Sequence, residues 1–407
     1  MKQIAKKTPL LLVGVIVFNL LITISPFVDY YSNWQITAIP LMIIMLYNWR
    51  NRRTFIASFY ILAMGFALVM YQFWFIHRVA EPYSFMINGI IAWTPCIIAI
   101  ACTYSLKPNT QKIILQIALI AMMITSYTTI IGLETFPFAA RELAGAADQH
   151  LRDTYMLMNI GGFEFIYALV LAIPIVMWMI ENTRGIQKVL NIVVLISFLY
   201  CIYMSSYATA LIIAFSVLWL MVLSMNPEAK PLLILFGVLF IVMICTGLLA
   251  ELVLWMRSFV ESDYVADRLL QVAQLLQGTS ANDVDTDTTN ERLVLMQNAW
   301  DGFVQSPLWG NNIVSWNKSV LSGHSFVLDI LSASGVLGLL IYCSIFFSIF
   351  KRVFQGYFKH YPFQCKTVWL AFIALTIMNP SAFAIIYIVI FLFTIIINNI
   401  EKSKNEY

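Results

Sequence analysis

Long apolar runs constrain this chain more than any other feature of its 407 residues. About a dozen of them, most near 20 residues long, follow one another, separated by polar breaks. Apolar residues make up 61% of the chain and charged residues 11%, whereas soluble domains carry roughly 25% charged residues. Because so few charges cannot cover a water-exposed surface, the sequence excludes a soluble globular protein and predicts an all-α polytopic membrane protein.

The apolar runs predict twelve membrane-spanning helices. We expect single spans at 9–27, 34–47, 55–73, 85–104, 113–132, 163–180, 231–250 and 326–350, and pairs of spans within 189–224 and 367–398. Small polar residues at 204–209 divide the first pair, and Asn379 with Pro380 divides the second. The first run follows three lysines and lacks a small-residue cleavage site, which favours an uncleaved span over a signal peptide.

The spans divide the chain into three predicted regions. Residues 1–250 form a membrane bundle of nine spans with an outer loop at 133–162, residues 251–325 form a long, partly helical extracytoplasmic loop, and residues 326–407 form the last three spans with a cytoplasmic tail. Within the long loop, Thr288 and Glu291 make a capping-box pattern that opens a helix, and Ser306 with Pro307 ends it.

The charges predict the orientation of the spans. When alternate loops are assigned to the two sides, the side with both termini holds 17 of the 24 lysines and arginines and only 4 of the 21 acidic residues. Positive residues favour the cytoplasmic side, so we expect both termini inside. No ionisable residue lies deep within a span, and no internal repeat is visible, which argues against an ion-coupled transporter.

The acidic outer side carries few cations, and these are candidate ligands for an anionic substrate: Arg141 and Arg152 in the first long loop, and Arg257, Arg268 and Arg292 in the second. Arginine suits a diphosphate because its planar guanidinium makes paired hydrogen bonds and stays charged. Alternatively, these arginines pair with neighbouring acids, as Arg152 could with Asp153 and Arg268 with Asp267, or bind lipid headgroups.

His324 stands at the last polar step before the span at 326–350. An imidazole at that boundary could accept a proton from a sugar hydroxyl, and the alternative is an interfacial histidine with one hydrogen bond. The six cysteines show no metal-binding spacing, and the run Asp283, Asp285 and Asp287 lacks the glycine and final glutamate of a calcium loop. Nucleotide-binding motifs and a basic stripe for nucleic acid are also missing from the sequence.

Two neighbouring segments resemble the signature of the O-antigen polymerase and ligase family. Residues 290–312 read NERLVLMQNAWDGFVQSPLWGNN, and residues 323–342 read GHSFVLDILSASGVLGLLIY. The shared pattern is an arginine at a helix start, a periodic apolar helix, a proline followed by a glycine, and a histidine at the foot of a span with Gly-x-x-Gly. The matching positions are Arg292, Trp300, Pro307, Gly310, His324, Gly335 and Gly338.

The resemblance implies a polymerase for O-antigen, capsule or exopolysaccharide in a bacterial plasma membrane, with its active site on the extracytoplasmic face. It would join repeat units carried on polyprenyl diphosphate by inverting glycosyl transfer, without nucleotide, metal or other cofactor. His324 and Arg292 would be catalytic, and the substrate-binding residues would be Arg268, Arg152, Arg141, Trp300 and Gly310. Its partners would be the lipid-linked donor and acceptor, the bilayer, a flippase and a chain-length regulator, and no nucleic acid.

Two departures from the family pattern favour a polymerase over a ligase. Many ligases carry an arginine at the tight outer turn, where this chain has Ser205-Ser206-Tyr207-Ala208, and often a His-x-His-Asn motif, where it has Gly323-His324-Ser325-Phe326. A ligase that transfers the glycan to a separate acceptor lipid stays an alternative. So does a lipid-linked glycan flippase or permease, which should line a central cavity with charges across its depth.

Overall fold

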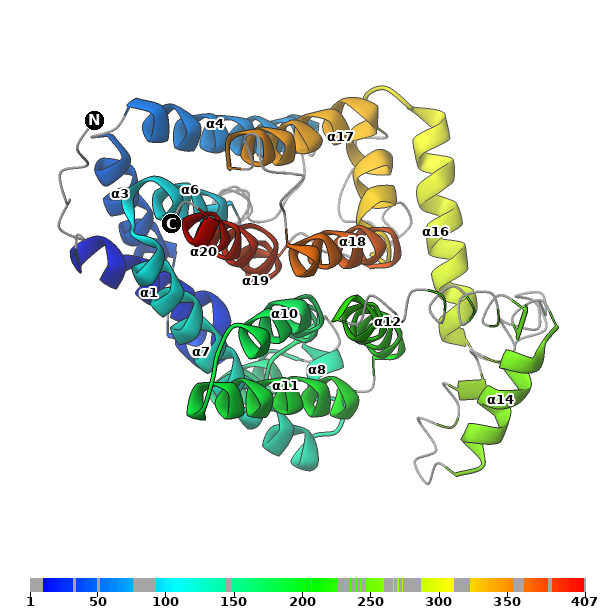
Figure 1. Ribbon diagram of the computed structural model, residues 1–407. Helices are drawn as coiled ribbons and strands as arrows, with labels where there is room; N and C mark the ends of the chain where they lie inside the picture. Colours follow the sequence, from blue (N-terminus) through cyan, green and yellow to red (C-terminus); the bar gives the residue numbers. More distant parts are fainter. Residues whose placement is uncertain are drawn as a thin grey trace.

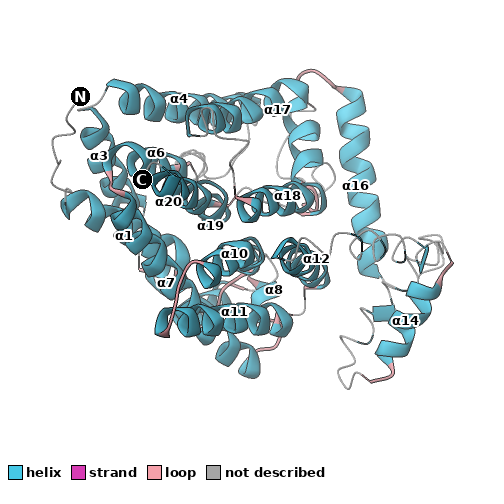
Figure 2. Ribbon diagram, viewed as in Figure 1, coloured by secondary structure: helices cyan, strands magenta, loops and turns pink. Residues whose placement is uncertain are grey.

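The computed structural model describes residues 10–31, 34–49, 52–75, 93–143, 148–205, 207–225, 287–310, 323–353, 362–379 and 383–405, with scattered positions between 231 and 273 of which 246–259 is the longest stretch. All regular structure in these residues is helical (Figures 1 and 2). The first part of the chain forms α1 (Leu10–Ile24), α2 (Pro26–Tyr30), α3 (Trp34–Trp49), α4 (Arg52–Phe75), α6 (Thr94–Ser105), α7 (Pro108–Thr135), α8 (Ala139–Glu142), α9 (Gln149–Leu157) and α10 (Phe163–Glu181). The remainder forms α11 (Ile186–Met204), α12 (Ala208–Met225), α14 (Leu248–Arg257), α16 (Asp287–Gln305), α17 (Phe326–Val353), α18 (Phe363–Met378), α19 (Ala384–Tyr387), the π-helix η4 (Ile388–Phe393) and α20 (Thr394–Asn405).

The apolar helices of the described residues coincide in part with the predicted spans. Five are long and apolar enough to cross a membrane, namely α7, α10, α11, the first 24 residues of α17, and the continuous helix 384–404. Six shorter apolar helices fall in α1, α3, α4, α6, α12 and α18. These eleven segments overlap eleven of the twelve predicted spans, and the predicted span 231–250 lies mostly outside the described residues. The architecture is therefore all-helical and suited to a membrane.

The predicted helix ends are confirmed at three places. The small polar break separates α11, which ends at Met204, from α12, which begins at Ala208. The Asn-Pro break separates α18 from α19, and α16 ends at Gln305, directly before Ser306 and Pro307. These signals worked because each of them interrupts the backbone hydrogen bonding of a helix locally.

The core of the bundle is formed by α6, α10 and the helix α19–η4–α20. Most residues of these helices are buried, including all of η4, and η4 contacts α6 and α10. Tyr342 of α17 and Tyr387 of α19 meet in this core with their hydroxyl oxygens 2.7 Å apart. In contrast, α11 is apolar yet largely exposed, as its residues Ile186, Val189 and Ile196 show. Exposed apolar side chains on a peripheral helix suit contact with lipid.

Several long-range contacts gather helix ends at one end of the bundle, which we call the long-loop end. The Tyr207 hydroxyl before α12 donates to the Ala140 carbonyl of α8 at 2.8 Å. The Phe163 ring of α10 contacts the rings of Tyr207 and Phe383, and the Phe326 amide of α17 donates to the Asn379 carbonyl after α18 at 3.3 Å. In Figure 1, α16 stands upright at the right of the bundle, whereas α4, α11 and α18 run from side to side.

One predicted span differs from the structure. Residues 326–350 were expected to form a single uninterrupted helix, but α17 is broken at Gly335, where φ is 62° and ψ is −166°. The first part of α17 lies beside α16, and the second part packs along α4 (Figure 1). The break has a tertiary cause, because the chain that follows α16 packs against this point.

Candidate functional site at the long-loop end

The junction between α16 and α17 is made by backbone atoms. After α16 the chain turns, with the Gly310 amide donating to the Ser306 carbonyl at 2.8 Å. The Val336 amide then donates to the Pro307 carbonyl at 2.9 Å, and the Leu337 amide to the Leu308 carbonyl at 3.2 Å. Because α17 is broken at Gly335, the amides of Val336 and Leu337 have no acceptor within the helix. The carbonyl oxygens of the turn after α16 accept their hydrogen bonds instead.

Two glycines allow this close approach. Gly310 has φ 76°, and a Cβ atom on it would lie 2.3 Å from the backbone nitrogen of Ser334. Gly335 has φ 62°, and a Cβ atom there would lie 2.4 Å from the Leu308 carbonyl oxygen. A residue with a Cβ atom could replace either glycine only if the backbone moved, because the left-handed conformation and the short distance to the neighbouring backbone both favour glycine. Gly310, predicted to bind substrate, thus has a structural reason to be glycine.

His324 lies in a tight turn that begins α17. The Gly323 amide donates to Asp329 Oδ2 at 3.1 Å, and the Leu328 amide donates to the Ser325 hydroxyl at 3.4 Å. The adjacent Phe326 amide is held by Asn379, as described above. His324 itself is half-buried. The imidazole is therefore carried on a turn whose backbone is fixed from both sides.

The other predicted residues of the long loop are placed in part. Arg292 lies near the start of α16, and its side chain is outside the described part of the structure. Arg268 lies outside the described residues. Trp300 is 49% exposed and contacts the ring of Phe303 on its own helix. The structure therefore joins Gly310 to α17 and places Trp300 against Phe303 on α16.

Arg141 and Arg152 lie on short helices in the first long loop. Arg141 is half-buried on α8, and Arg152 is exposed on α9, where Asp148 caps the helix by accepting from the Leu151 amide at 2.8 Å. The suggested pairing of Arg152 with Asp153 is not formed. Among the described residues, Asp153 instead accepts a hydrogen bond of 2.8 Å from Gln149.

A small pocket of about 100 Å³ lies beside Arg152. Its charged and polar lining comes from four helices or their ends, with Thr23 from α1, Asp29 from α2, Arg152 from α9 and Glu164 from α10. The half-buried Glu164 carboxylate is attracted by the Arg152 guanidinium and repelled by the Asp29 carboxylate. The sequence did not single out Asp29 and Glu164 as site residues, because nothing in it brings either carboxylate together with Arg152.

Asn159 holds the walls of this pocket together. Its Oδ1 accepts from the Ser25 hydroxyl at 2.8 Å and from the Phe27 amide at 3.1 Å, while its Nδ2 donates to the Thr128 hydroxyl at 2.9 Å. Asn159 has φ 57°, a left-handed conformation that asparagine tolerates better than most residues. One side chain thus ties the turn between α9 and α10 to the ends of α1 and α7.

A second polar contact braces α8 against α9. The Tyr155 hydroxyl donates to Glu142 Oε2 at 2.5 Å, inside a small apolar cluster that includes Leu133, Ala140 and Ile160. The hydrogen bond to Glu142 raises the pKa of Tyr155 to about 12, because ionisation would lose this bond and place two negative charges together.

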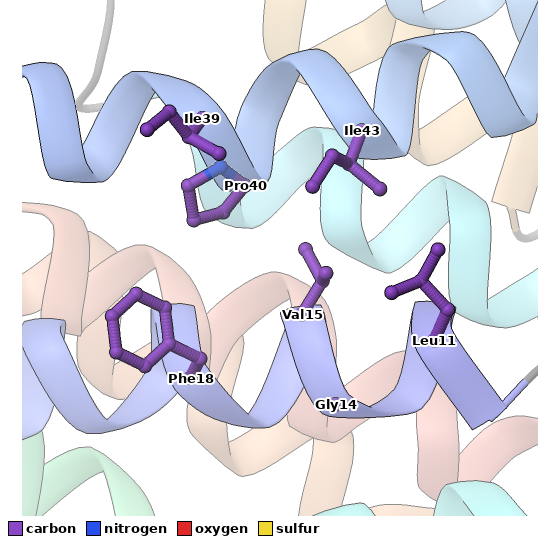
Figure 3. Close-up of a pocket in the computed structure, with 7 residues that line it drawn as sticks. All are labelled: Leu11, Gly14, Val15, Phe18, Ile39, Pro40 and Ile43. Carbon is purple, nitrogen blue, oxygen red and sulfur yellow. The ribbon is translucent and has the colours of Figure 1, made fainter.

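A larger pocket between α1 and α3 is of a different kind. It has a volume of about 420 Å³ and is lined by Leu11, Gly14, Val15, Phe18, Ile39, Pro40 and Ile43 (Figure 3). In Figure 3 the side chains of the two helices point toward one another across the space between them. Its lining offers contacts to hydrocarbon and no ionisable group for chemistry.

Among the described residues, no group of three His, Cys, Asp or Glu side chains is arranged to hold a metal ion. No protein-family model, curated protein or solved structure matches this chain. The function is therefore argued from the site itself.

Proposed function

We propose that this chain is an integral-membrane polysaccharide polymerase. It would join repeat units carried on polyprenyl diphosphate, with the long-loop end on the extracytoplasmic side of a bacterial plasma membrane. The observation that carries the proposal is the backbone junction between α16 and α17. Pro307, Gly310 and Gly335, three positions of the family resemblance drawn from two separate segments, meet there at hydrogen-bond and van der Waals distance.

This junction has a consequence for chemistry, because it fixes the helix that carries Arg292 against the helix that begins after His324. In Figure 1 the first part of α17 runs in the same direction as α16, so the starts of both helices lie toward the same side. Rigid elements position reacting groups better than loops do. Arg292 and His324 would then act on one substrate pair.

The proposed reaction is a single displacement at the anomeric carbon of the donor. A hydroxyl oxygen of the acceptor forms the new bond to that carbon, while the bond from carbon to the diphosphate oxygen breaks. The hydroxyl proton passes to the imidazole of His324, and the electron pair leaves on the diphosphate. Arg292 and Arg268, with Arg141 near the same end, would stabilise the negative charge that develops there. Such a displacement inverts the anomeric configuration.

Purified protein in vesicles, given one lipid-linked repeat unit without nucleotide and with excess chelator, tests this proposal. A ladder of products that differ by one repeat unit supports a polymerase. Single transfer to an added acceptor lipid supports the ligase alternative. Translocation of the lipid-linked glycan without any covalent product contradicts the enzyme proposal and favours a flippase.

A further inference from the structure

The pocket beside Arg152 has a charge balance that does not suit a diphosphate. Of its lining residues, Asp29 and Glu164 are acidic and Arg152 is basic, so the lining carries a formal charge of −1. A diphosphate brings further negative charge, and two carboxylates within the same small pocket would repel it. Arg152 is therefore poorly placed for the leaving group, although the sequence suggested that role.

The same lining suits the hydroxyl groups of a sugar. A hydroxyl both donates and accepts, so it can donate to the carboxylates of Asp29 and Glu164 while it accepts from the guanidinium of Arg152. Arg152 forms no ion pair with any residue in the described part of the chain, which leaves its donors available to a ligand. Met156 and Phe165 add apolar wall, which suits the C–H face of a sugar ring.

The size of the pocket fits one part of a sugar. A water needs roughly 10–15 Å³ of such volume, so about 100 Å³ accommodates several hydroxyl-sized groups but no long oligosaccharide. A ligand would place the edge of one terminal ring inside and leave the rest of its chain outside. Such a pocket selects for the end of a glycan.

The pocket lies beside the segment after α18, which also makes a hydrogen bond to the turn that carries His324. Ile385 lines the pocket, and six residues earlier the Asn379 carbonyl accepts from the Phe326 amide beside His324. Six residues span at most about 20 Å, so the pocket and the imidazole belong to one region of the long-loop end.

We propose that the pocket formed by Asp29, Arg152 and Glu164 binds the non-reducing terminal sugar of the acceptor glycan. This inference rests on the proposed function. It separates the roles of the arginines, since Arg152 holds a neutral sugar whereas Arg292 and its neighbours hold the diphosphate of the donor. Asn159 positions the pocket because it fixes the turn between α9, which carries Arg152, and α10, which carries Glu164.

The test measures binding of the free repeat-unit oligosaccharide, released from its lipid and labelled at its reducing end, to the full protein in nanodiscs. Glu164→Gln and Arg152→Gln each keep a polar side chain but remove a charge, and each should weaken binding about tenfold or more. Asp153→Asn is the matched control, because it removes a carboxylate from α9 outside the pocket and should leave binding unchanged. Size-exclusion profiles check that all variants fold.

A second measurement separates this inference from the proposed function. In transfer reactions that use the oligosaccharide as acceptor, the two variants should raise the KM for the acceptor and leave the KM for the lipid-linked donor unchanged. Wild-type binding with no transfer would contradict the proposed function while leaving the pocket assigned to a sugar. The inference would be overturned if the two variants bind the oligosaccharide like wild type, or if wild-type protein binds none at millimolar concentration. It would also be overturned if the variants raise the KM for the donor as much as the KM for the acceptor.

Discussion

The backbone amide of Val336 donates a hydrogen bond of 2.9 Å to the carbonyl oxygen of Pro307. These two residues are separated by a turn, a segment outside the described residues and the first part of α17. The bond exists because α17 is broken at Gly335, and the break is stabilised because the turn after α16 supplies the acceptors. Each of the two features therefore depends on the other.

Gly310→Ala should break this junction. The new methyl group would overlap backbone atoms of Ala333 and Ser334, and alanine at φ 76° adds about 1–2 kcal/mol of strain. We expect a loss of more than about 2 kcal/mol in the free energy of unfolding, measured by denaturation in detergent, and at least a tenfold loss of product. Gly185→Ala is the control, since Gly185 has φ 58° with nothing within 4 Å of the added Cβ. Equal effects of the two variants would contradict the account of the junction.

Asn159→Ala should destabilise the long-loop end by about 4 kcal/mol. Three side-chain hydrogen bonds at about 1 kcal/mol each are lost, and alanine pays for the left-handed backbone. Asn159→Gly loses the same bonds without the backbone strain, so it should be about 1 kcal/mol more stable than Asn159→Ala. Equilibrium unfolding of the three proteins checks the order, and an alanine variant as stable as wild type would show that Asn159 is not the connector.

Tyr155 should make stability depend on pH in the alkaline range. Its pKa is about 12 in the folded protein and near the ordinary 10 when unfolded, so its contribution is fully present below pH 10. That contribution is lost as the pH rises from 10 to 12, because the unfolded state releases the proton first. Unfolding midpoints measured across this range should fall less steeply for Tyr155→Phe. The control is Tyr127→Phe, which removes an exposed hydroxyl from α7; an identical slope for both variants would argue against the Glu142 contact.

Cysteine labelling should place the two ends of the bundle on opposite sides of the membrane. In a cysteine-free background, Asp301→Cys on α16 should react with a membrane-impermeant maleimide added outside intact cells. Lys188→Cys at the start of α11 should react only after permeabilisation. Both residues are exposed, so access to the reagent depends on the side alone. Reversed labelling would contradict the orientation that the charge distribution predicts.

Sequence reasoning succeeded where one segment decides its own structure. The predicted span 163–180 is α10, Phe163–Glu181, because an apolar run of that length has a single solution in lipid. The break at Asn379 and Pro380 separates α18 from α19 for an equally local reason. Neither result needed any knowledge of the neighbouring helices.

It failed where distant segments decide together. The residues around Gly335 did not predict the break in α17, because its cause is the backbone at Leu308 and Gly310. The place of Glu164 in a pocket follows only from Asp29 and Arg152, each more than ten residues away along the chain. Asn159 shows the same limit, since its partners are Ser25 between α1 and α2, Phe27 of α2 and Thr128 of α7. The turn signal Asn159-Ile160-Gly161-Gly162 was the one local clue available.

Whether the chain is a polymerase is decided by the length of the products that the purified protein makes from a single lipid-linked repeat unit in the presence of a chelator. Mass spectrometry should show a ladder spaced by one repeat-unit mass for the wild type. His324→Ala and Arg292→Ala should each reduce it nearly to nothing while the protein still inserts into membranes. Wild-type protein that leaves the repeat unit unextended, or variants that extend it at the wild-type rate, would contradict the account.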